Sequence, residues 1–271
     1  MHRTRAGVRL WLTLAAACVI AACAGPPARP EAAPQVLLLG EVHDNPDGHA
    51  RRYAWLRARV DAGWRPTIAM EQFDRDRQAD LDRALAECAD ASCVVGRAAP
   101  DGQGWEWPLY APVIELALER RLPVRAANLS RADASRVVRE GYRAALDDAT
   151  IAAFGLDGPL PRDLAEGQRL AIDESHCGQL PASIAEGMVR AQVARDVQMA
   201  TVVAAVAARG DGVALLAGNG HVRRDLGVPR WLERTAAARA FSIGFVEEPA
   251  EGAFDERVAI APHARVDPCA K

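Results

Sequence analysis

Short, strongly apolar runs alternate with longer stretches of helical composition along most of this chain. The runs occupy residues 36–39, 67–70, 123–127, 213–217, 241–246 and 258–261. Such an alternation is typical of a largely parallel sheet that carries helices on its faces. The sequence therefore predicts an α/β fold with a largely parallel central sheet flanked by helices.

Helix signals fall between these runs. Asn45 and Pro46 offer a cap and a first-turn proline for a helix over residues 47–60, and a second helix is expected over residues 74–87. The long segment 131–209 is mostly helical in composition, which predicts a helical insert or lid. Within it, residues 183–208 place apolar side chains at three- and four-residue steps, as one amphipathic helix does.

Two of the apolar runs end in the same motif, G-x-x-H, at residues 40–43 and 218–221. Ligands of an open parallel sheet gather outside the carboxyl ends of its strands. A glycine there permits a tight turn and close approach of a ligand. We therefore expect His43 and His221, although far apart in sequence, to share one cleft.

Polar residues follow other runs in the same manner. Glu71 follows the second run and Asn128 the third, so both join Glu41, His43 and His221 in one candidate cluster. Imidazole and carboxylate groups suit Zn, Mn or Fe, and they also suit general acid and base chemistry. Two other interpretations stay open: helix-capping acids with structural histidines, or an adaptor whose strand-end polar groups only satisfy one another.

The N-terminus has the pattern of an export signal. Three arginines precede an apolar run over residues 10–22 that is too short to span a bilayer as a helix. The sequence IAAC at 20–23 resembles the lipobox of bacterial lipoproteins, in which the cysteine is acylated. We expect residues 1–22 to be a lipoprotein signal peptide and Cys23 to carry the lipid. An ordinary cleavable signal, with an incidental Cys23, is the alternative.

A proline-rich tether over residues 23–34 leads to a single domain over residues 35–271. The full chain has 33 basic and 36 acidic residues, and loss of the signal peptide would remove three arginines and no acidic residue. An acidic mature chain argues against nucleic acid as a partner.

Four cysteines remain in the domain, and an even number in an oxidising compartment suggests two disulfides. Cys88 with Cys93 would close a small polar loop, which leaves Cys177 for Cys269. Free buried thiols are the alternative. Neither a C-x-x-C motif nor a zinc-like spacing occurs, so a structural zinc site is not expected.

Several blocks, in order and across nearly all of the mature chain, resemble the ChaN-like haem-binding lipoproteins. They are GEVHDN at 40–45, MEQF at 70–73, WPLYAP at 107–112, ANL at 127–129, HCG at 176–178, RAQ at 190–192, RDVQMA at 195–200 and GNGHVR at 218–223. This family belongs to a wider group with the Tiki proteins, TraB and the erythromycin esterases, in which paired G-x-x-H motifs support metal-dependent hydrolysis in some members.

The resemblance implies an iron-regulated outer-membrane lipoprotein that binds haem through a tyrosine, and it leaves open a homodimer that encloses two cofacial haems. Tyr110 is the nominated axial ligand, because it lies in an aromatic-rich stretch, and His176 is the rival. A rim tyrosine whose hydroxyl only meets a hydrogen-bond partner is the alternative for Tyr110. Arg190 or Arg223 would pair with propionates or keep the phenol ionised. Both arginines have a solvated surface charge as their alternative.

Two functions follow as expectations. The first is haem capture, storage or transfer at the cell envelope, with His43, His221, Glu41 and Asn128 beside the axial residue, and a haem receptor or transporter as a partner. The anchor would lie in the outer membrane facing the periplasm. The second is a metal-dependent hydrolase in which a divalent ion takes the place of haem as cofactor, bound by four side chains: Glu41, His43, Glu71 and His221.

Overall fold

The computed structural model describes residues 36–100, 102, 104–232, 240–249, 252–266, 269 and 270, together with His2. Apart from His2, the expected signal peptide, the expected lipidation site Cys23 and the expected tether over residues 23–34 lie outside the described residues. Contacts divide the chain into two units, residues 1–32 and 33–271, and the fold described below is that of the second unit.

Six strands form one sheet in the order β3-β2-β4-β1-β5-β6, and every neighbouring pair is parallel. The strands are β1 (Val36–Leu39), β2 (Thr67–Asp74), β3 (Val124–Asn128), β4 (Val213–Leu216), β5 (Ala240–Glu247) and β6 (Glu256–Ile260). Every strand run expected from the sequence is present, with boundaries shifted by a few residues. The predicted α/β class with a parallel sheet is confirmed.

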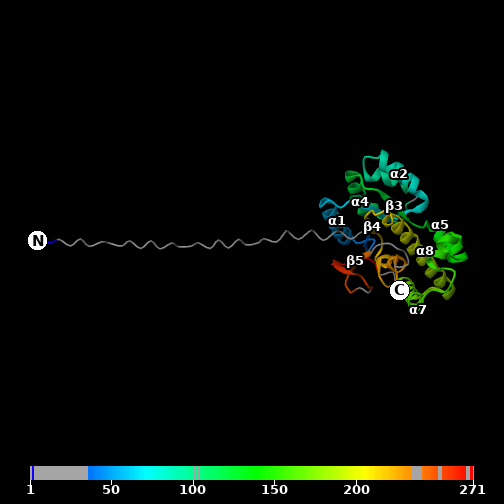
Figure 1. The fold of residues 1–271 in the computed structure, drawn as a ribbon. Helices are drawn as coiled ribbons and strands as arrows, with labels where there is room; N and C mark the ends of the chain where they lie inside the picture. Colours follow the sequence, from blue (N-terminus) through cyan, green and yellow to red (C-terminus); the bar gives the residue numbers. More distant parts are fainter. Residues whose placement is uncertain are drawn as a thin grey trace. The chain divides into compact units, whose positions relative to one another are not determined.

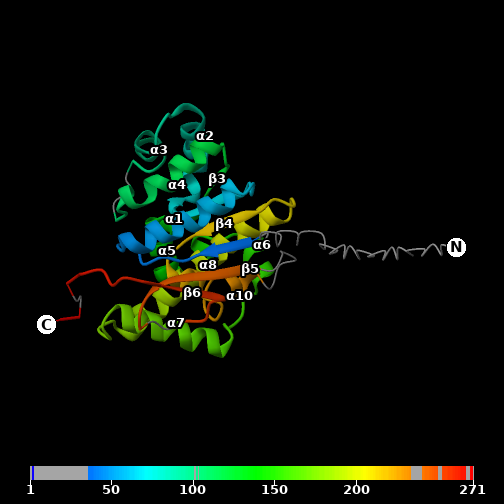
Figure 2. The same cartoon turned by 90° about the vertical axis from the view of Figure 1, so that its left-hand side faces the viewer.

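Helices cover both faces of the sheet (Figures 1 and 2). The first face carries α1 (Pro46–Asp61), α2 (Gln78–Glu87), α3 (Ala91–Ala98) and α4 (Trp107–Arg120), with the short turn η1 (Arg75–Arg77) before α2. β1 shows why both faces need cover. Its side chains alternate, so that Leu37 and Leu39 pack under this layer while Val36 and Leu38 pack on the opposite one.

The helical segment between β3 and β4 forms most of the opposite layer. It comprises α5 (Arg131–Glu140), η2 (Tyr142–Ala144), α6 (Asp148–Phe154), α7 (Arg162–Ser175) and α8 (Ala182–Ala207). The long helix α8 contacts β2, β3 and β4, and α5 and α7 in turn contact α8. Two short helices, α9 (Asn219–Val222) and α10 (Val228–Leu232), follow β4.

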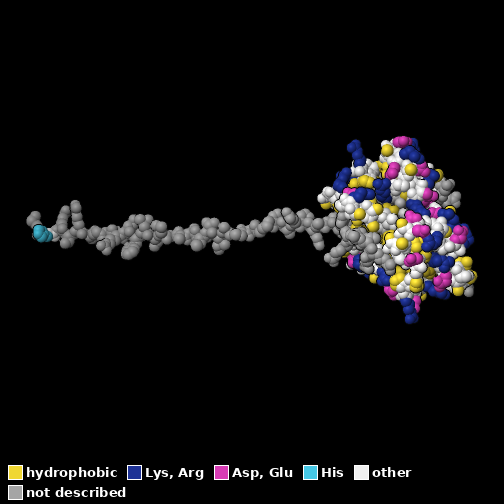
Figure 3. All heavy atoms as spheres, turned by 45° about the vertical axis from the view of Figure 1, so that its right-hand side comes forward, with side chains coloured by type: hydrophobic (Ala, Val, Ile, Leu, Met, Phe, Trp, Pro, Cys, Tyr) yellow, Lys and Arg dark blue, Asp and Glu magenta, His cyan; other side chains and the backbone are white. Residues whose placement is uncertain are grey.

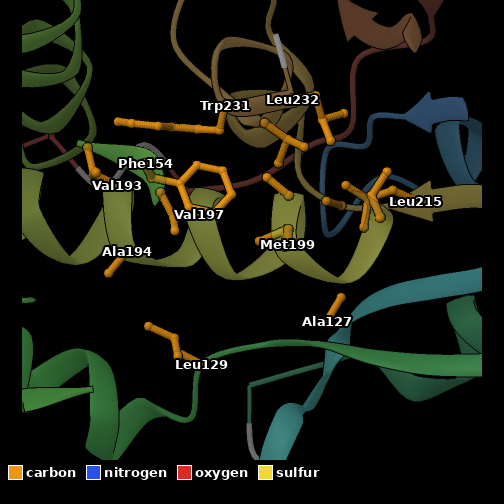
Figure 4. Packing of buried hydrophobic residues seen from close by; sticks show 14 of the residues in the cluster. Ala127, Leu129, Phe154, Val193, Ala194, Val197, Met199, Leu215, Trp231 and Leu232 are labelled. Carbon is orange, nitrogen blue, oxygen red and sulfur yellow. The ribbon is translucent and has the colours of Figure 1, made fainter. Parts of the chain in front are cut away.

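Apolar side chains of α8 form the centre of this second layer. Val197 lies beside the ring of Phe154, and Met199, Leu215 and Trp231 belong to the same apolar cluster (Figure 4). All five are at most 5% exposed. Complete burial of a side chain of this size contributes roughly 1.5–3 kcal/mol, so α8 is held to the sheet mainly by apolar packing.

Both predicted disulfides are present. Cys88 is bonded to Cys93, five residues away, and Cys177 is bonded to Cys269, 92 residues away. Within the described residues, no helix combines the length and apolar composition needed to cross a bilayer. On the face drawn in Figure 3, basic and acidic side chains are interspersed.

The contact between α8 and α5 yields a stability prediction. A Cβ added at Gly187 of α8 would lie 2.7 Å from the backbone oxygen of Val138, which cannot move without shifting α5. Gly187→Ala should therefore lower the free energy of unfolding by about 1–3 kcal/mol, measured by urea titration. Gly96→Ala is the matched control: Gly96 lies in α3 with nothing within 4 Å, so its replacement should stabilise by about 0.5–1 kcal/mol. Equal effects of the two substitutions would contradict this packing.

Candidate functional site

The two G-x-x-H turns lie side by side because β1 and β4 are neighbours in the sheet. Leu39 pairs with Leu216 at the end of both strands, and the two turns then meet. The backbone N–H of Asn219 donates to the carbonyl of Glu41 at 2.9 Å. Gly40 has no room for a side chain, since a Cβ there would lie 2.1 Å from Oδ1 of Asn219. The turns can approach this closely only with glycine at that position.

Both turns line a cleft of about 840 Å³. It opens at the carboxyl ends of the strands, where parallel sheets bind ligands. The lining contains two histidines, three acids and two arginines. It consists of Glu41, Val42, His43, Asp44, Glu71, Gln192, Arg195, Gly218, Asn219, Gly220, His221 and Arg265.

Glu41 holds His43 in a defined tautomer. Oε1 of this buried carboxylate accepts from Nδ1 of His43 at 2.7 Å, from the hydroxyl of Tyr110 at 2.6 Å and from Nε2 of Gln72 at 3.3 Å. Oε2 accepts from Arg52. An ionised carboxylate only accepts, so Nδ1 of His43 must carry a proton. In the tautomer with its proton on Nδ1, the lone pair is on Nε2, and the side chain is 50% exposed.

Arg52 balances the charge of Glu41 inside the protein. Burial lowers the pKa of Arg52 to about 10, so the guanidinium remains charged at neutral pH. It also donates to Nδ1 of His49 at 3.1 Å, and Nε2 of His49 bonds to the carbonyl of His43 at 3.0 Å. The backbone of the first turn is thereby tied to α1. Loss of one partner of such a buried pair typically costs about 3–5 kcal/mol.

His221 lies between two buried carboxylates. Nδ1 is 2.6 Å from Oδ1 of Asp196, and Nε2 is 3.4 Å from Oε1 of Glu71. Burial alone would lower the pKa of His221, but the two carboxylates outweigh it and raise the pKa to about 10. His221 is therefore an imidazolium at neutral pH, with both nitrogens engaged.

The pKa values of the two carboxylates shift in opposite directions. Burial would raise the pKa of Glu71, but the charge of His221 and the N–H of Gly218, which donates to Oε2 at 2.8 Å, lower it to about 2. Asp196, on α8, is fully buried, and burial raises its pKa to about 6 despite the contact with His221. Both groups are ionised at pH 7.

Several groups around this cleft lie outside the expected cluster of site residues, although Gln192, Arg195 and Asp196 fall within the RAQ and RDVQMA blocks. Asp196 supplies the shorter contact to His221, and Gln192, one turn earlier on α8, lies 3.3 Å from Nδ1 of the same ring. Arg195 lines the cleft and donates to Oδ1 of Asn128 at 2.9 Å. Arg265 reaches the cleft from the C-terminal segment. Two signals pointed to Asp196: it lies in the RDVQMA block, and it shares a helix face with Gln192, for which a surface pair was the simpler interpretation.

Other expected residues lie away from the cleft lining. His176 follows α7 and bonds through Nδ1 to the carbonyl of Ile172 at 2.9 Å. Arg190 donates to the carbonyl of Val138 at 3.0 Å, and Arg223 pairs with Asp225. All three side chains therefore make contacts within the protein, away from the cleft lining.

Tyr110 also has a different position from the one its nomination requires. Its side chain is fully buried, its hydroxyl donates to Glu41, and it is absent from the cleft lining. Burial raises the pKa of the phenol further above its usual value, which disfavours the tyrosinate that an iron ligand would need.

The expected four-residue metal site is not assembled. Among the described residues, no group of three or more His, Cys, Asp or Glu side chains is arranged to hold a metal ion. The reason is physical: both oxygens of Glu41 already accept from protein donors, and the two nitrogens of His221 face Asp196 and Glu71. A divalent ion would have to displace these contacts.

Comparison with known proteins identifies relatives of this fold. Residues 30–232 match the family model described as haem-binding uptake, Tiki superfamily, ChaN. Among curated protein sequences, none matches the chain. ChaN of Campylobacter jejuni, solved with cofacially bound haem, superposes with a TM-score of 0.61 at 19% identity, and the match covers 80% of this chain and 84% of that one.

Two further solved structures are more distant. A mutant of the erythromycin esterase EreC in its open conformation gives a TM-score of 0.44 at 11% identity, covering 78% of this chain and 70% of that one. The type III effector HopBA1 gives a TM-score of 0.40 at 12% identity, covering 84% of this chain and 88% of that one.

The charge of His221 gives a pH prediction. Because the folded-state pKa is raised from 6.5 to about 10, its stabilising contribution is complete below pH 6.5 and is lost as the pH rises towards 10. NMR titration should show His221 protonated at pH 8. Asp196→Asn should lower the pKa of His221 and destabilise the protein by about 3 kcal/mol. Asp211→Asn, at an exposed residue, is the control and should do neither. A neutral His221 at pH 7 in the unsubstituted protein would refute the assignment.

Proposed function

The chain belongs to the ChaN family of haem-binding uptake proteins in the Tiki superfamily, and from this premise we propose that it binds haem in the cleft between the β1 and β4 turns, with His43 as the axial ligand. The single observation that carries the proposal is the state of the His43 ring. Its Nδ1 is fixed on Glu41, while Nε2 has no hydrogen-bond partner among the described residues.

The competing ligands are less well placed to bind iron, because Tyr110 and His176 lie outside the cleft lining and both nitrogens of His221 face carboxylates. His221 is a cation between Asp196 and Glu71, and the Tyr110 hydroxyl is buried on Glu41. The carboxylate on Nδ1 of His43 is the outer contact that metal-bound imidazoles commonly have, and it makes Nε2 a better donor. Haem bound through Nε2 would be exchangeable, because the sequence has no C-x-x-C-H motif for covalent attachment.

Glycines and one aromatic ring surround His43. A Cβ at Gly218 would lie 2.9 Å from Nε2 of His43, so only glycine leaves the ring this position. Gly220 also presents no side chain to the cleft. Trp105 lies edge-on to His43 with 5.0 Å between ring centroids, which adds an apolar surface.

Most of the remaining lining is polar, with Val42 as its apolar side chain. The apolar part of a porphyrin would therefore need cover from outside this cleft. That requirement supports a homodimer as the haem-bound form, in which a second copy provides the missing surface.

A cation for the haem propionates is also at hand. Arg195 lines the cleft and donates to the neutral amide of Asn128, so its charge is available to a ligand carboxylate. We propose Arg195 in place of Arg190 and Arg223 for this role, because those two side chains are engaged elsewhere.

The cellular role is proposed from the N-terminal pattern together with the family. The lipobox at 20–23 supports a lipid anchor on Cys23, and Ala24 favours an outer-membrane position facing the periplasm. There the protein would capture, store or transfer haem, with a haem receptor or transporter as its partner. Loss of acylation in a Cys23→Ser chain would test the anchor.

Hemin titration tests the proposal. The soluble domain should give a saturable shift of the Soret band, and His43→Ala should move that band and weaken binding by more than about tenfold, or 1.4 kcal/mol. His176→Ala is the matched control and should leave both unchanged, because His176 lies outside the cleft lining. Tyr110→Phe should keep the band position. A Soret band that stays in place in His43→Ala but moves in Tyr110→Phe would contradict His43 ligation.

A second function is favoured by one contact, the 2.7 Å hydrogen bond between Glu41 and His43. An imidazole held in this way can take a proton from water at Nε2, and the His221 cation can stabilise developing negative charge, as hydrolysis requires. Esterase and peptidase assays should then show turnover that resists chelators and disappears in His43→Ala. Turnover that survives His43→Ala would exclude this candidate.

A further inference from the structure

The C-terminal segment forms one side of the cleft. Residues 261–266 follow β6 without helix or strand, and Arg265 of this segment lines the cleft together with His43 and Asp44. We call residues 261–266 the strap. It lies beyond residue 232, where the family match ends, so it is not part of the region that the chain shares with the matched family model.

Arg265 joins the strap to Asp44, which follows the first turn, and to the end of β5. Its Nε and Nη2 donate to the two oxygens of Asp44, each at 2.8 Å. Its Nη1 and Nη2 donate to Glu247, the last residue of β5, at 2.7 and 2.8 Å. Asp44 directly follows His43, so the guanidinium holds the chain that carries the proposed haem ligand. The geometry is that of paired two-point contacts with carboxylates.

Backbone contacts continue this attachment. Nδ2 of Asn45 donates to the carbonyl of Ala261 at 2.8 Å, and the N–H of Ala261 donates to Asp47 at 3.0 Å. The N–H of His263 donates to Glu247 at 3.1 Å. All these contacts tie the strap to the β1 side of the cleft. They are polar contacts at a surface where every strap residue is exposed, so the strap can open without exposing a buried apolar core.

A covalent bond fixes the chain just beyond the strap. Three residues beyond the strap, Cys269 is bonded to Cys177, which follows α7 in the helical layer. The C-terminus accordingly lies near α7 (Figures 1 and 2). The C-terminal end of the strap is therefore held twice, by Arg265 near His43 and, four residues later, by the disulfide to the helical layer.

We propose that the strap retains ligand in the cleft and that reduction of Cys177–Cys269 releases it. This inference rests on the proposed ligand site at His43. A dithiol would supply the two electrons: its thiolate attacks one sulfur, the S–S bond breaks, and its second thiol resolves the mixed disulfide. Cys177 and Cys269 become thiols, and the dithiol becomes a disulfide. The strap is then held by its exposed polar contacts alone.

The test compares two variants of the full chain, each lacking one disulfide. Cys177→Ser with Cys269→Ser should raise hydrogen exchange in residues 261–266 and speed hemin transfer to excess apomyoglobin by about tenfold, as expected if strap opening limits release. Cys88→Ser with Cys93→Ser is the matched control. That bond joins α2 to α3 on the other face, so neither quantity should change. Serine variants avoid the reaction of thiol reductants with hemin.

The outcomes separate this inference from the haem proposal. Faster exchange in the strap together with faster hemin transfer supports it. Unchanged hydrogen exchange in the Cys177/Cys269 variant overturns the claim that this disulfide fastens the strap. Faster exchange with unchanged hemin transfer overturns the role of the strap in retention. If hemin fails to bind either variant and the unsubstituted chain, the haem proposal fails and the retention role falls with it, while the exchange data still decide whether the disulfide fastens the strap. Arg265→Ala should raise exchange in the strap even with both disulfides intact.

Discussion

Three carboxylates buried at one edge of the sheet constrain the rest of the site. Glu41, Glu71 and Asp196 are each at most 4% exposed, and a charge removed from water must be paired and hydrogen-bonded. Arg52 and His221 supply the opposite charges. Because each pairing fills specific lone pairs, the carboxylates determine which nitrogens of the neighbouring imidazoles carry protons. The ligand chemistry of the cleft follows from that pattern.

The two G-x-x-H histidines consequently differ in what they offer, although their strands end in the same motif. His43 meets one carboxylate, keeps a lone pair and is half exposed. His221 meets two, is charged and is nearly buried. The Nε2 lone pair of His43 beside the His221 cation suits a ligand that has an electron-poor centre and a nearby negative charge. Ferric haem has both, through its iron and its propionates, and so does the polarised carbonyl of an ester undergoing hydrolysis.

Sequence patterns predicted the elements of the fold and its class, because buried parallel strands and amphipathic helices leave periodic signals. They also placed His43 and His221 at one edge, since parallel strands share their carboxyl ends. Patterns could not reveal partners from distant elements: Asp196 is 25 residues from His221, and Arg265 is 221 residues from Asp44. Tyr110 was nominated because aromatic-rich stretches favour haem contacts, but composition cannot show that its hydroxyl is used by Glu41 inside the core.

The position of iron in the hemin-loaded protein tests the central claim most directly. Anomalous diffraction at the iron edge from crystals of that complex would place the metal without assumptions about the macrocycle. The account predicts an iron peak at coordination distance from Nε2 of His43, in the cleft between the β1 and β4 turns. A peak at Tyr110, at His176 or outside this cleft would contradict it.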